Sequence, residues 1–205
     1  MNAAKNPRLG IVILGAGASS RMGQPKLLLP WRGTTVIGHL ISQWQQLGAA
    51  QIAVVMRAHD AAFAGELNRL NFSKSERIEN PQPERGMFSS IVCAASWTGW
   101  RPEISSWAVV LGDQPHLRSE TLRELLVFSA RHPEAICQPT FEGHARHPVI
   151  LPCPAFEELK HSGAATLKDF LKLSPQSHVQ CPVADAGLSL DMDRPEDYRQ
   201  LVNSN

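Results

Sequence analysis

Short apolar segments rich in β-branched residues alternate along this chain with segments whose apolar residues recur at helical spacing. The first of them, Leu9–Leu14, predicts a buried strand, and Val36–Leu47 carries an apolar stripe that predicts a helix ending near Gly48. Strands that alternate with helices in this way form mainly parallel sheets with helices on both faces. We therefore expect an α/β fold.

The same two patterns predict the other elements, and the five tryptophans lie on apolar stripes that predict core positions. The predicted strands are Leu9–Leu14, Gln51–Met56, Trp107–Leu111, Ala135–Pro139 and Pro148–Leu151, and the predicted helices are Val36–Leu47, Ala61–Leu70, Ser89–Trp97, Ser119–Arg131, Ala155–His161, Ala165–Leu173 and Pro195–Val202.

Composition limits the classes of partner. The chain has 205 residues, of which 43% are hydrophobic, and its formal net charge is +1. A chain of this length buries roughly 70% of the surface that its unfolded form exposes, so we expect one folded domain over residues 1–205. Near-neutral charge without a run of like charges argues against nucleic acid or an anionic membrane surface as a partner. No stretch approaches the ~18 apolar residues of a membrane span.

The cysteine pattern predicts a protein of the reducing cytoplasm. Lys5 and Arg8 before Leu9–Leu14 resemble the start of a signal peptide, but this apolar run is short and cleavage after it would remove the best motif in the chain. The cysteines are never at the C-x-x-C spacing of a zinc or redox site; they are Cys93, Cys137, Cys153 and Cys181.

A loop of small residues, Gly15–Ser20, follows the first predicted strand, and two cations, Arg21 and Lys26, stand beyond it. Small residues let backbone amides approach phosphate oxygens, and the cations would offset the charge of a triphosphate. The alternative is a tight turn with two solvated cations. Two common glycine-rich loops do not match this segment. A Walker loop needs Gly-Lys-Ser/Thr, where this chain has Gly23–Lys26. A dinucleotide-binding loop needs a third glycine at the position of Ser20.

Motifs along nearly the whole chain follow one another in a specific order. They are Leu14–Gly17, Ser19–Gly23, Lys26–Pro30, Arg85–Ile91, Leu111–Pro115, His147–Val149 and Leu190–Asp197. In these motifs the chain resembles the molybdenum cofactor nucleotidylyltransferases of the MobA-like superfamily. The resemblance implies a three-layer, Rossmann-like sheet of the nucleotide-diphospho-sugar transferase type. It also implies transfer of a nucleotidyl group from a nucleoside triphosphate to the phosphate of molybdopterin, with release of pyrophosphate.

Asp113 follows a buried run and should emerge at the carboxyl end of a central strand, the edge where open α/β sheets bind ligands. A carboxylate beside phosphates needs an intervening cation, and Mg²⁺ binds one or two carboxylates together with phosphate oxygens. We therefore predict Mg²⁺ as the cofactor and Asp113 as a ligand. An Asp before a turn is also a common cap.

Asp191 and Asp193 end a further predicted strand, Leu188–Met192. The family pattern implies a second metal contact at the residue before x-Pro-Glu-Asp, which is Asp193 here, and Asp191 is the reserve candidate. Glu196 and Asp197 lie in the first turn of the last predicted helix, where they favour the helix dipole, so we expect them to be structural.

Family position adds Gly86 and Ser90 to the expected nucleotide contacts, although serines at this helix start also suit an ordinary cap. The predicted catalytic residues are Arg21, Lys26 and Asp113, the predicted metal ligands are Asp113 and Asp193, and the predicted nucleotide-binding residues are Leu14, Gly15, Ala16, Gly17, Ser20, Arg21, Lys26, Gly86, Ser90 and Asp113.

The expected acceptor-binding residues are His147 and Arg146. His147 and Pro148 match the family's His-Pro pair near the cofactor, and Arg146 stands where close relatives usually have Gly. Its guanidinium would either grip the pterin phosphate or obstruct the loop. A metal site on His144 and His147 would need a helix, which Pro148 disfavours.

The expected partners are CTP or GTP, molybdopterin, and a client molybdenum hydroxylase or its chaperone. In this family the third residue of the motif at 14–17 tends to be Ala in cytidylyl enzymes and Gly in guanylyl enzymes, so Ala16 favours CTP. Two alternatives stay open. One is transfer to a sugar or polyol phosphate, and the other is a non-catalytic module that binds or matures the cofactor.

Overall fold

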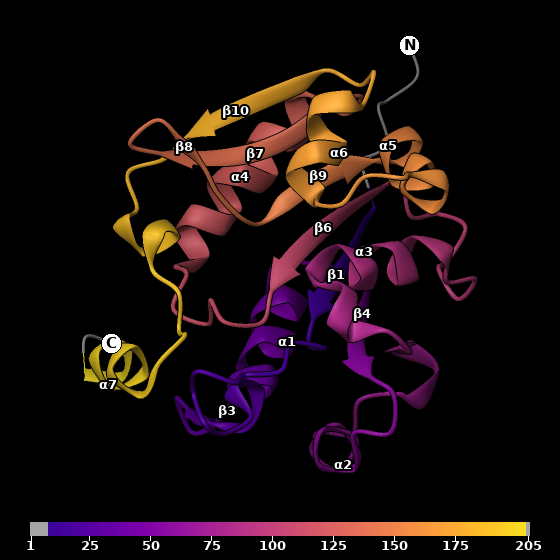
Figure 1. Cartoon of the computed structure of the whole chain (residues 1–205). Helices are drawn as coiled ribbons and strands as arrows, with labels where there is room; N and C mark the ends of the chain where they lie inside the picture. Colours follow the sequence, from indigo (N-terminus) through magenta and orange to yellow (C-terminus); the bar gives the residue numbers. More distant parts are fainter. Residues whose placement is uncertain (1–7, 204–205) are drawn as a thin grey trace.

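A mixed sheet of eight strands organises the described residues, 8–203, of the computed structural model (Figure 1). The strands are β1 (Leu9–Leu14), β4 (Gln51–Arg57), β5 (Arg77–Asn80), β6 (Ser106–Leu111), β7 (Ile136–Phe141), β8 (His144–Ala145), β9 (Val149–Pro152) and β10 (His178–Pro182); β2 (Pro30–Trp31) and β3 (Thr34–Thr35) form a separate hairpin. Their order is β10-β7-β9-β6-β1-β4-β5, and β8 pairs with β7. β9 is antiparallel to β6 and β7, and the other neighbours along this order are parallel.

Helices cover both faces of the sheet, because successive residues of a strand point to opposite sides. The helices are α1 (Val36–Gln46), α2 (Ala61–Arg69), α3 (Met87–Ser96), α4 (Ser119–Arg131), α5 (Cys153–Glu158), α6 (Leu167–Leu173) and α7 (Pro195–Asn203). On one face Ile11 and Ile13 belong to a core shared with α1, α2 and α4. On the other, Val12 and Leu14 share a core with α3, α5 and α6. The α/β class and the three-layer arrangement are confirmed.

Edge positions explain the strands that the sequence pattern missed. β5 and β10 lie at the two edges of the sheet and alternate polar with buried residues, so neither presents the apolar run that predicts a central strand. The other predicted helices and strands are confirmed to within two residues, with Ala155–His161 divided into α5 and a 3-10 turn. Gly48 ends α1 as expected, with a φ of +85°.

The predicted strand Leu188–Met192 is wrong. Residues Ala186–Ser189 form a 3-10 turn, whose start is capped by Asp185 because its Oδ1 accepts a hydrogen bond of 3.0 Å from the amide of Gly187. The chain then reaches the sheet through one backbone hydrogen bond, from the Met192 amide to the Asp113 carbonyl oxygen (3.2 Å). A local turn thus replaces the strand but still carries the acidic segment to the end of β6.

The core prediction for tryptophans holds for Trp31, Trp44 and Trp107, which are at most 4% exposed. Trp97 and Trp100 are half-buried and pack against the α3 side of the sheet. None of the helices in residues 8–203 combines the length and apolarity that crossing a bilayer requires. All four cysteines are free thiols. Lys5, part of the leader-like pattern, lies outside the described residues.

Asp185 joins the segment before α7 to the start of α4. Its buried carboxylate accepts hydrogen bonds from Thr121 Oγ1 (2.5 Å) and the Gly187 amide (3.0 Å), and it pairs with Arg118 Nε (3.2 Å). Burial raises the pKa of this carboxyl, but the bonds from Thr121, Gly187 and Arg118 together outweigh burial and hold the pKa below its usual value. The charged form therefore stabilises the fold.

We expect Asp185→Asn to lower the free energy of unfolding by about 1.5–3 kcal/mol near pH 7, because hydrogen bonds to a charged group are lost. A carboxyl whose folded pKa is lowered stabilises above about pH 4 and loses this contribution as the pH falls through its folded pKa. Urea unfolding of both proteins at pH 7 and pH 3 tests this. The difference should shrink at pH 3, and an equal difference at both pH values would contradict the assignment.

Candidate nucleotide-binding site

The glycine-rich loop leaves the sheet where the parallel strands β1 and β6 end. Leu14 pairs with Leu111, so the loop after β1 and the turn after β6 start at the same level. A Cβ at Gly15 would lie 2.9 Å from the Val55 carbonyl oxygen, and a Cβ at Gly112 would lie 2.7 Å from the Leu14 carbonyl oxygen. Only glycine permits backbones to approach this closely, which explains both positions.

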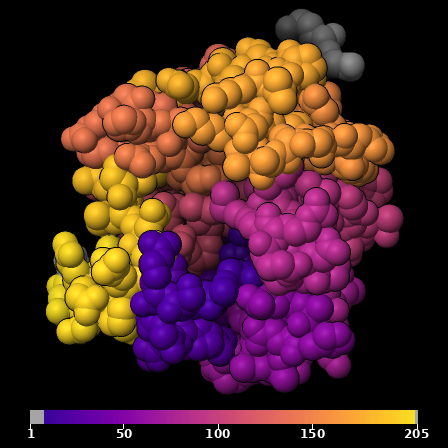
Figure 2. All heavy atoms as spheres, viewed as in Figure 1, coloured from indigo at the N-terminus to yellow at the C-terminus, as the bar shows by residue number. Residues whose placement is uncertain are grey.

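A cavity of about 360 Å³ opens between this loop, the start of α3 and the end of β6. Figure 2 shows the surface hollowed between the indigo and magenta segments. The lining residues are Leu14, Gly15, Ala16, Gly17, Ala18, Ser19, Lys26, Leu27, Pro83, Gly86, Met87, Ser90, Leu111, Gly112 and Asp113. Eight predicted nucleotide contacts are among them, whereas Ser20 and Arg21 are not. Sequence reasoning did not assign Ser19, Met87 or Pro83 to the site, although Ser19 and Met87 lie within the motifs Ser19–Gly23 and Arg85–Ile91.

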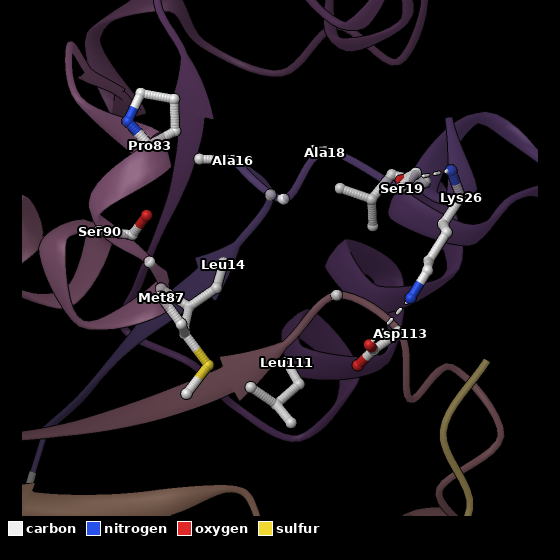
Figure 3. Close-up of a pocket in the computed structure, with 15 residues that line it drawn as sticks. Leu14, Ala16, Ala18, Ser19, Lys26, Pro83, Met87, Ser90, Leu111 and Asp113 are labelled. Carbon is white, nitrogen blue, oxygen red and sulfur yellow. Dashed lines mark hydrogen bonds and ion pairs between the residues drawn. The ribbon is translucent and has the colours of Figure 1, made fainter. Parts of the chain in front are cut away.

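Two cations and two carboxylates gather at one end of the cavity. Figure 3 shows two of them, Lys26 and Asp113. Lys26 Nζ lies 3.3 Å from Asp113 Oδ2 and 2.5 Å from Asp193 Oδ1, and Arg21 Nη1 lies 2.7 Å from Asp193 Oδ2. The Ser19 hydroxyl accepts a hydrogen bond from the Lys26 amide at 3.2 Å, which holds the loop against the start of the next turn. The fold therefore brings together side chains that are far apart in the chain.

The two carboxylates differ in their surroundings. Burial raises the pKa of Asp113, the Lys26 charge lowers it, and the nearby Asp191 charge raises it again, so its pKa lies above the usual value. The hydrogen bond from Lys26 holds the pKa of Asp193 below the usual value, and Arg21 adds to this effect. Lys26 thus keeps both carboxyl groups closer to their charged form.

The carboxylates of Asp113 and Asp193 both face one cation position, because the Lys26 ammonium contacts each of them. Oxygen donors of this kind suit Mg²⁺, which usually binds one or two protein carboxylates and takes its other ligands from phosphates and water. Within residues 8–203 no three His, Cys, Asp or Glu side chains gather to hold a metal ion by themselves. A magnesium ion on these two carboxylates would take its other ligands from phosphate oxygens and water.

Neighbours of the carboxylates hold the acidic segment in place. The Asp191 Oδ1 accepts a hydrogen bond from Gln114 Nε2 (3.0 Å), which places Asp191 beside the turn after β6. Asp197 accepts from the amides of Asp193 (3.1 Å) and Arg194 (2.8 Å), so it caps the start of α7. The structural role predicted for Asp197 is confirmed.

The expected acceptor residues lie outside the cavity lining. His147 is packed against β6, with Nδ1 3.5 Å from the Val109 carbonyl oxygen, and burial lowers its pKa. Arg146 is half-buried, and its amide donates to the Pro139 carbonyl oxygen at 2.8 Å. Both residues flank the antiparallel strands β7 and β9, on the other side of β6 from the loop.

A family model described as "MobA-like NTP transferase domain" matches residues 11–180, a range that includes the loop, Asp113 and Ser90. The chain belongs to this family of nucleotidyltransferases. The resemblance seen in the motifs is confirmed, and the Asp191–Asp193 segment lies beyond the matched range.

Relatives cover nearly the whole chain. The molybdenum cofactor cytidylyltransferase of Escherichia coli K12 is 26% identical over 190 residues, which are 91% of this chain and 92% of that protein. The nicotine blue oxidoreductase of Paenarthrobacter nicotinovorans is 27% identical over 202 residues, 93% and 95% of the two chains. The crystal structure of Rv0371c from Mycobacterium tuberculosis H37Rv matches 97% of this chain and 100% of that chain, with a TM-score of 0.73 and 25% identity.

We expect Lys26→Met to raise the pKa of both Asp113 and Asp193, because the Lys26 charge lowers both in the native protein. Carbon-13 NMR titration of the carboxyl groups measures the change. Lys160→Met is the matched control, since Lys160 pairs with Glu157 on the surface. Unchanged titration of both aspartates in Lys26→Met would show that the ammonium does not lie between them.

Proposed function

We propose that this protein transfers a cytidylyl group from CTP to the terminal phosphate of molybdopterin and releases pyrophosphate. The observation that carries the proposal is the Lys26 ammonium held between Asp113 and Asp193, beside the loop of small residues that lines the cavity. Membership of the MobA-like family and the similarity to a molybdenum cofactor cytidylyltransferase support it.

In the proposed reaction an oxygen of the acceptor phosphate attacks the α-phosphorus of CTP in line. The new P–O bond forms while the bond to the β-phosphate oxygen breaks, and pyrophosphate leaves with that electron pair. The attacking phosphate is already anionic at neutral pH, so the site needs orientation and charge neutralisation more than a general base. The backbone amides of residues 16–19 would cradle the phosphates, and Lys26 and Arg21 would neutralise the transferring and leaving groups.

Asp113 and Asp193 would hold Mg²⁺, which when bound neutralises charge on the phosphate oxygens. Ser19 and Asp197 orient this end of the site, since Ser19 bonds the Lys26 amide and Asp197 bonds the Asp193 amide. We place the acceptor beyond the end of β6, towards His147 and Arg146, where the Arg146 guanidinium would bind a phosphate. A client molybdenum hydroxylase or its chaperone would then receive the dinucleotide cofactor.

Asp113→Ala should reduce pyrophosphate release by a factor of about 10² or more while the fold survives, because a charge-stabilising contact of the transition state is lost. A coupled pyrophosphate assay with Mg²⁺, CTP and molybdopterin measures the rate, and circular dichroism checks the fold. Glu134→Ala, at an exposed position in the turn after α4, is the matched control. Undiminished turnover in Asp113→Ala would refute the metal assignment.

The wild-type protein should form the cytidine product in preference to the guanosine product. Ala16 is 5% exposed and lines the cavity, where its methyl group adds apolar bulk. A size difference of this kind is worth about 1–3 kcal/mol, or about 10–200-fold in rate. Mass spectrometry of parallel reactions with CTP and GTP identifies the products. A guanosine preference would overturn the choice of nucleotide, and turnover of sugar phosphates but not molybdopterin would overturn the choice of acceptor.

A further inference from the structure

A hydrogen-bond network around Asn80 lies behind the start of α3. Asn80 is the last residue of β5 and only 1% exposed. Its Oδ1 accepts a hydrogen bond of 2.9 Å from the Gln82 amide, and its Nδ2 donates to Ser89 Oγ (2.8 Å) and Ser90 Oγ (3.0 Å). One buried carboxamide thus joins the end of a strand to the first turn of the helix that lines the cavity.

The orientation of this carboxamide follows from its partners. A backbone N–H can only donate, so the Asn80 atom that faces the Gln82 amide must be the oxygen. The nitrogen then faces the two serines, and its two hydrogens match the two hydroxyl oxygens. Both serine hydroxyls therefore act as acceptors towards Asn80.

The two serines differ in the acceptor that is available to their own hydroxyl hydrogen. Ser89 Oγ lies 2.7 Å from the Gly86 carbonyl oxygen, which accepts that hydrogen. Ser90 is 4% exposed and lines the cavity, and because its oxygen accepts from Asn80, its hydrogen must point to another partner. Figure 3 shows Ser90 at the end of the cavity away from Lys26 and Asp113. A ligand whose phosphates meet the cations would bring its nucleoside towards Ser90.

We propose that Asn80 is a positioning residue for nucleotide selection, which holds the Ser90 hydroxyl as a hydrogen-bond donor towards the nucleobase of the bound triphosphate. This inference rests on the proposed function, since it needs a nucleotide in the cavity. Cytosine suits such a donor because its pairing edge carries two neighbouring acceptors, O2 and N3. Asn80 does not touch the nucleotide and acts through Ser90.

Asn80→Asp tests the direction of these hydrogen bonds with almost no change of shape. An ionised carboxylate only accepts, so it keeps the Gln82 bond but takes the hydrogen of Ser90 and turns it away from the cavity. We expect the Kd for CTP with Mg²⁺, measured by calorimetry, to rise about tenfold, as expected for the loss of one hydrogen bond to the base. In the complete reaction KM should rise while kcat stays near the wild-type value.

The added negative charge also repels a nucleotide, so a double-mutant cycle with Ser90→Ala separates the two effects. If Ser90 carries the effect, Ser90→Ala alone should raise the Kd for CTP about tenfold, and Asn80→Asp should add little in that background. Inorganic triphosphate, which has no base, should bind to wild type and Ser90→Ala equally well. Ser89→Ala is the matched control and should leave the Kd for CTP within about twofold, because the Ser89 hydrogen is already bonded to Gly86.

An equal effect of Asn80→Asp on the Kd for CTP in wild type and in the Ser90→Ala background would overturn the positioning role. If Asn80→Asp does not fold, as judged by thermal unfolding, Ser90→Ala decides alone: unchanged CTP binding would overturn the inference. A wild-type protein that binds neither CTP nor GTP would instead contradict the proposed function. Wild-type binding with independent effects at the two positions would contradict only the role of Asn80.

Discussion

The parallel pairing of β1 with β6 positions the rest of the site. Because Leu14 and Leu111 are partners in this register, the amide-rich loop and the turn that carries Asp113 leave the sheet side by side. Gly112 allows this contact, since a Cβ there would lie 2.7 Å from the Leu14 carbonyl oxygen. Ligand sites at the carboxyl ends of parallel strands follow from this geometry in open α/β sheets.

Charge complementarity then divides the cavity into two ends. At one end Lys26 and Arg21 offset the carboxylates of Asp113 and Asp193, so four charged groups lie together without a large net charge. At the other end, Asn80 donates a hydrogen bond to the Ser90 hydroxyl oxygen, which leaves the hydroxyl hydrogen to be donated elsewhere. Under the proposed function, phosphates and a divalent ion would occupy the first end and the uncharged base the second. A nucleoside triphosphate combines both properties in one molecule.

The sequence pattern predicted those helices and strands whose own residues carry a clear apolar run or stripe. Leu9–Leu14 and Ser119–Arg131 match the structure residue for residue, because each presents a clear apolar run or stripe. The polar edge strand Arg77–Asn80 depends on pairing with β4, and Leu188–Met192 failed because the Asp185 cap favours a turn. Spacing alone could not bring Asp113 near Asp193, which the family resemblance implied. The role of Asn80 depends on hydrogen-bond direction, which only the folded structure shows.

A crystal structure with Mg²⁺ and a non-hydrolysable CTP analogue tests the central claim most directly. The account predicts the triphosphate over the amides of residues 16–19, phosphate oxygens within hydrogen-bond distance of Lys26 Nζ, and the metal ion on Asp113 and Asp193. A nucleotide bound elsewhere on the protein, or a metal ion that neither aspartate contacts, would contradict it.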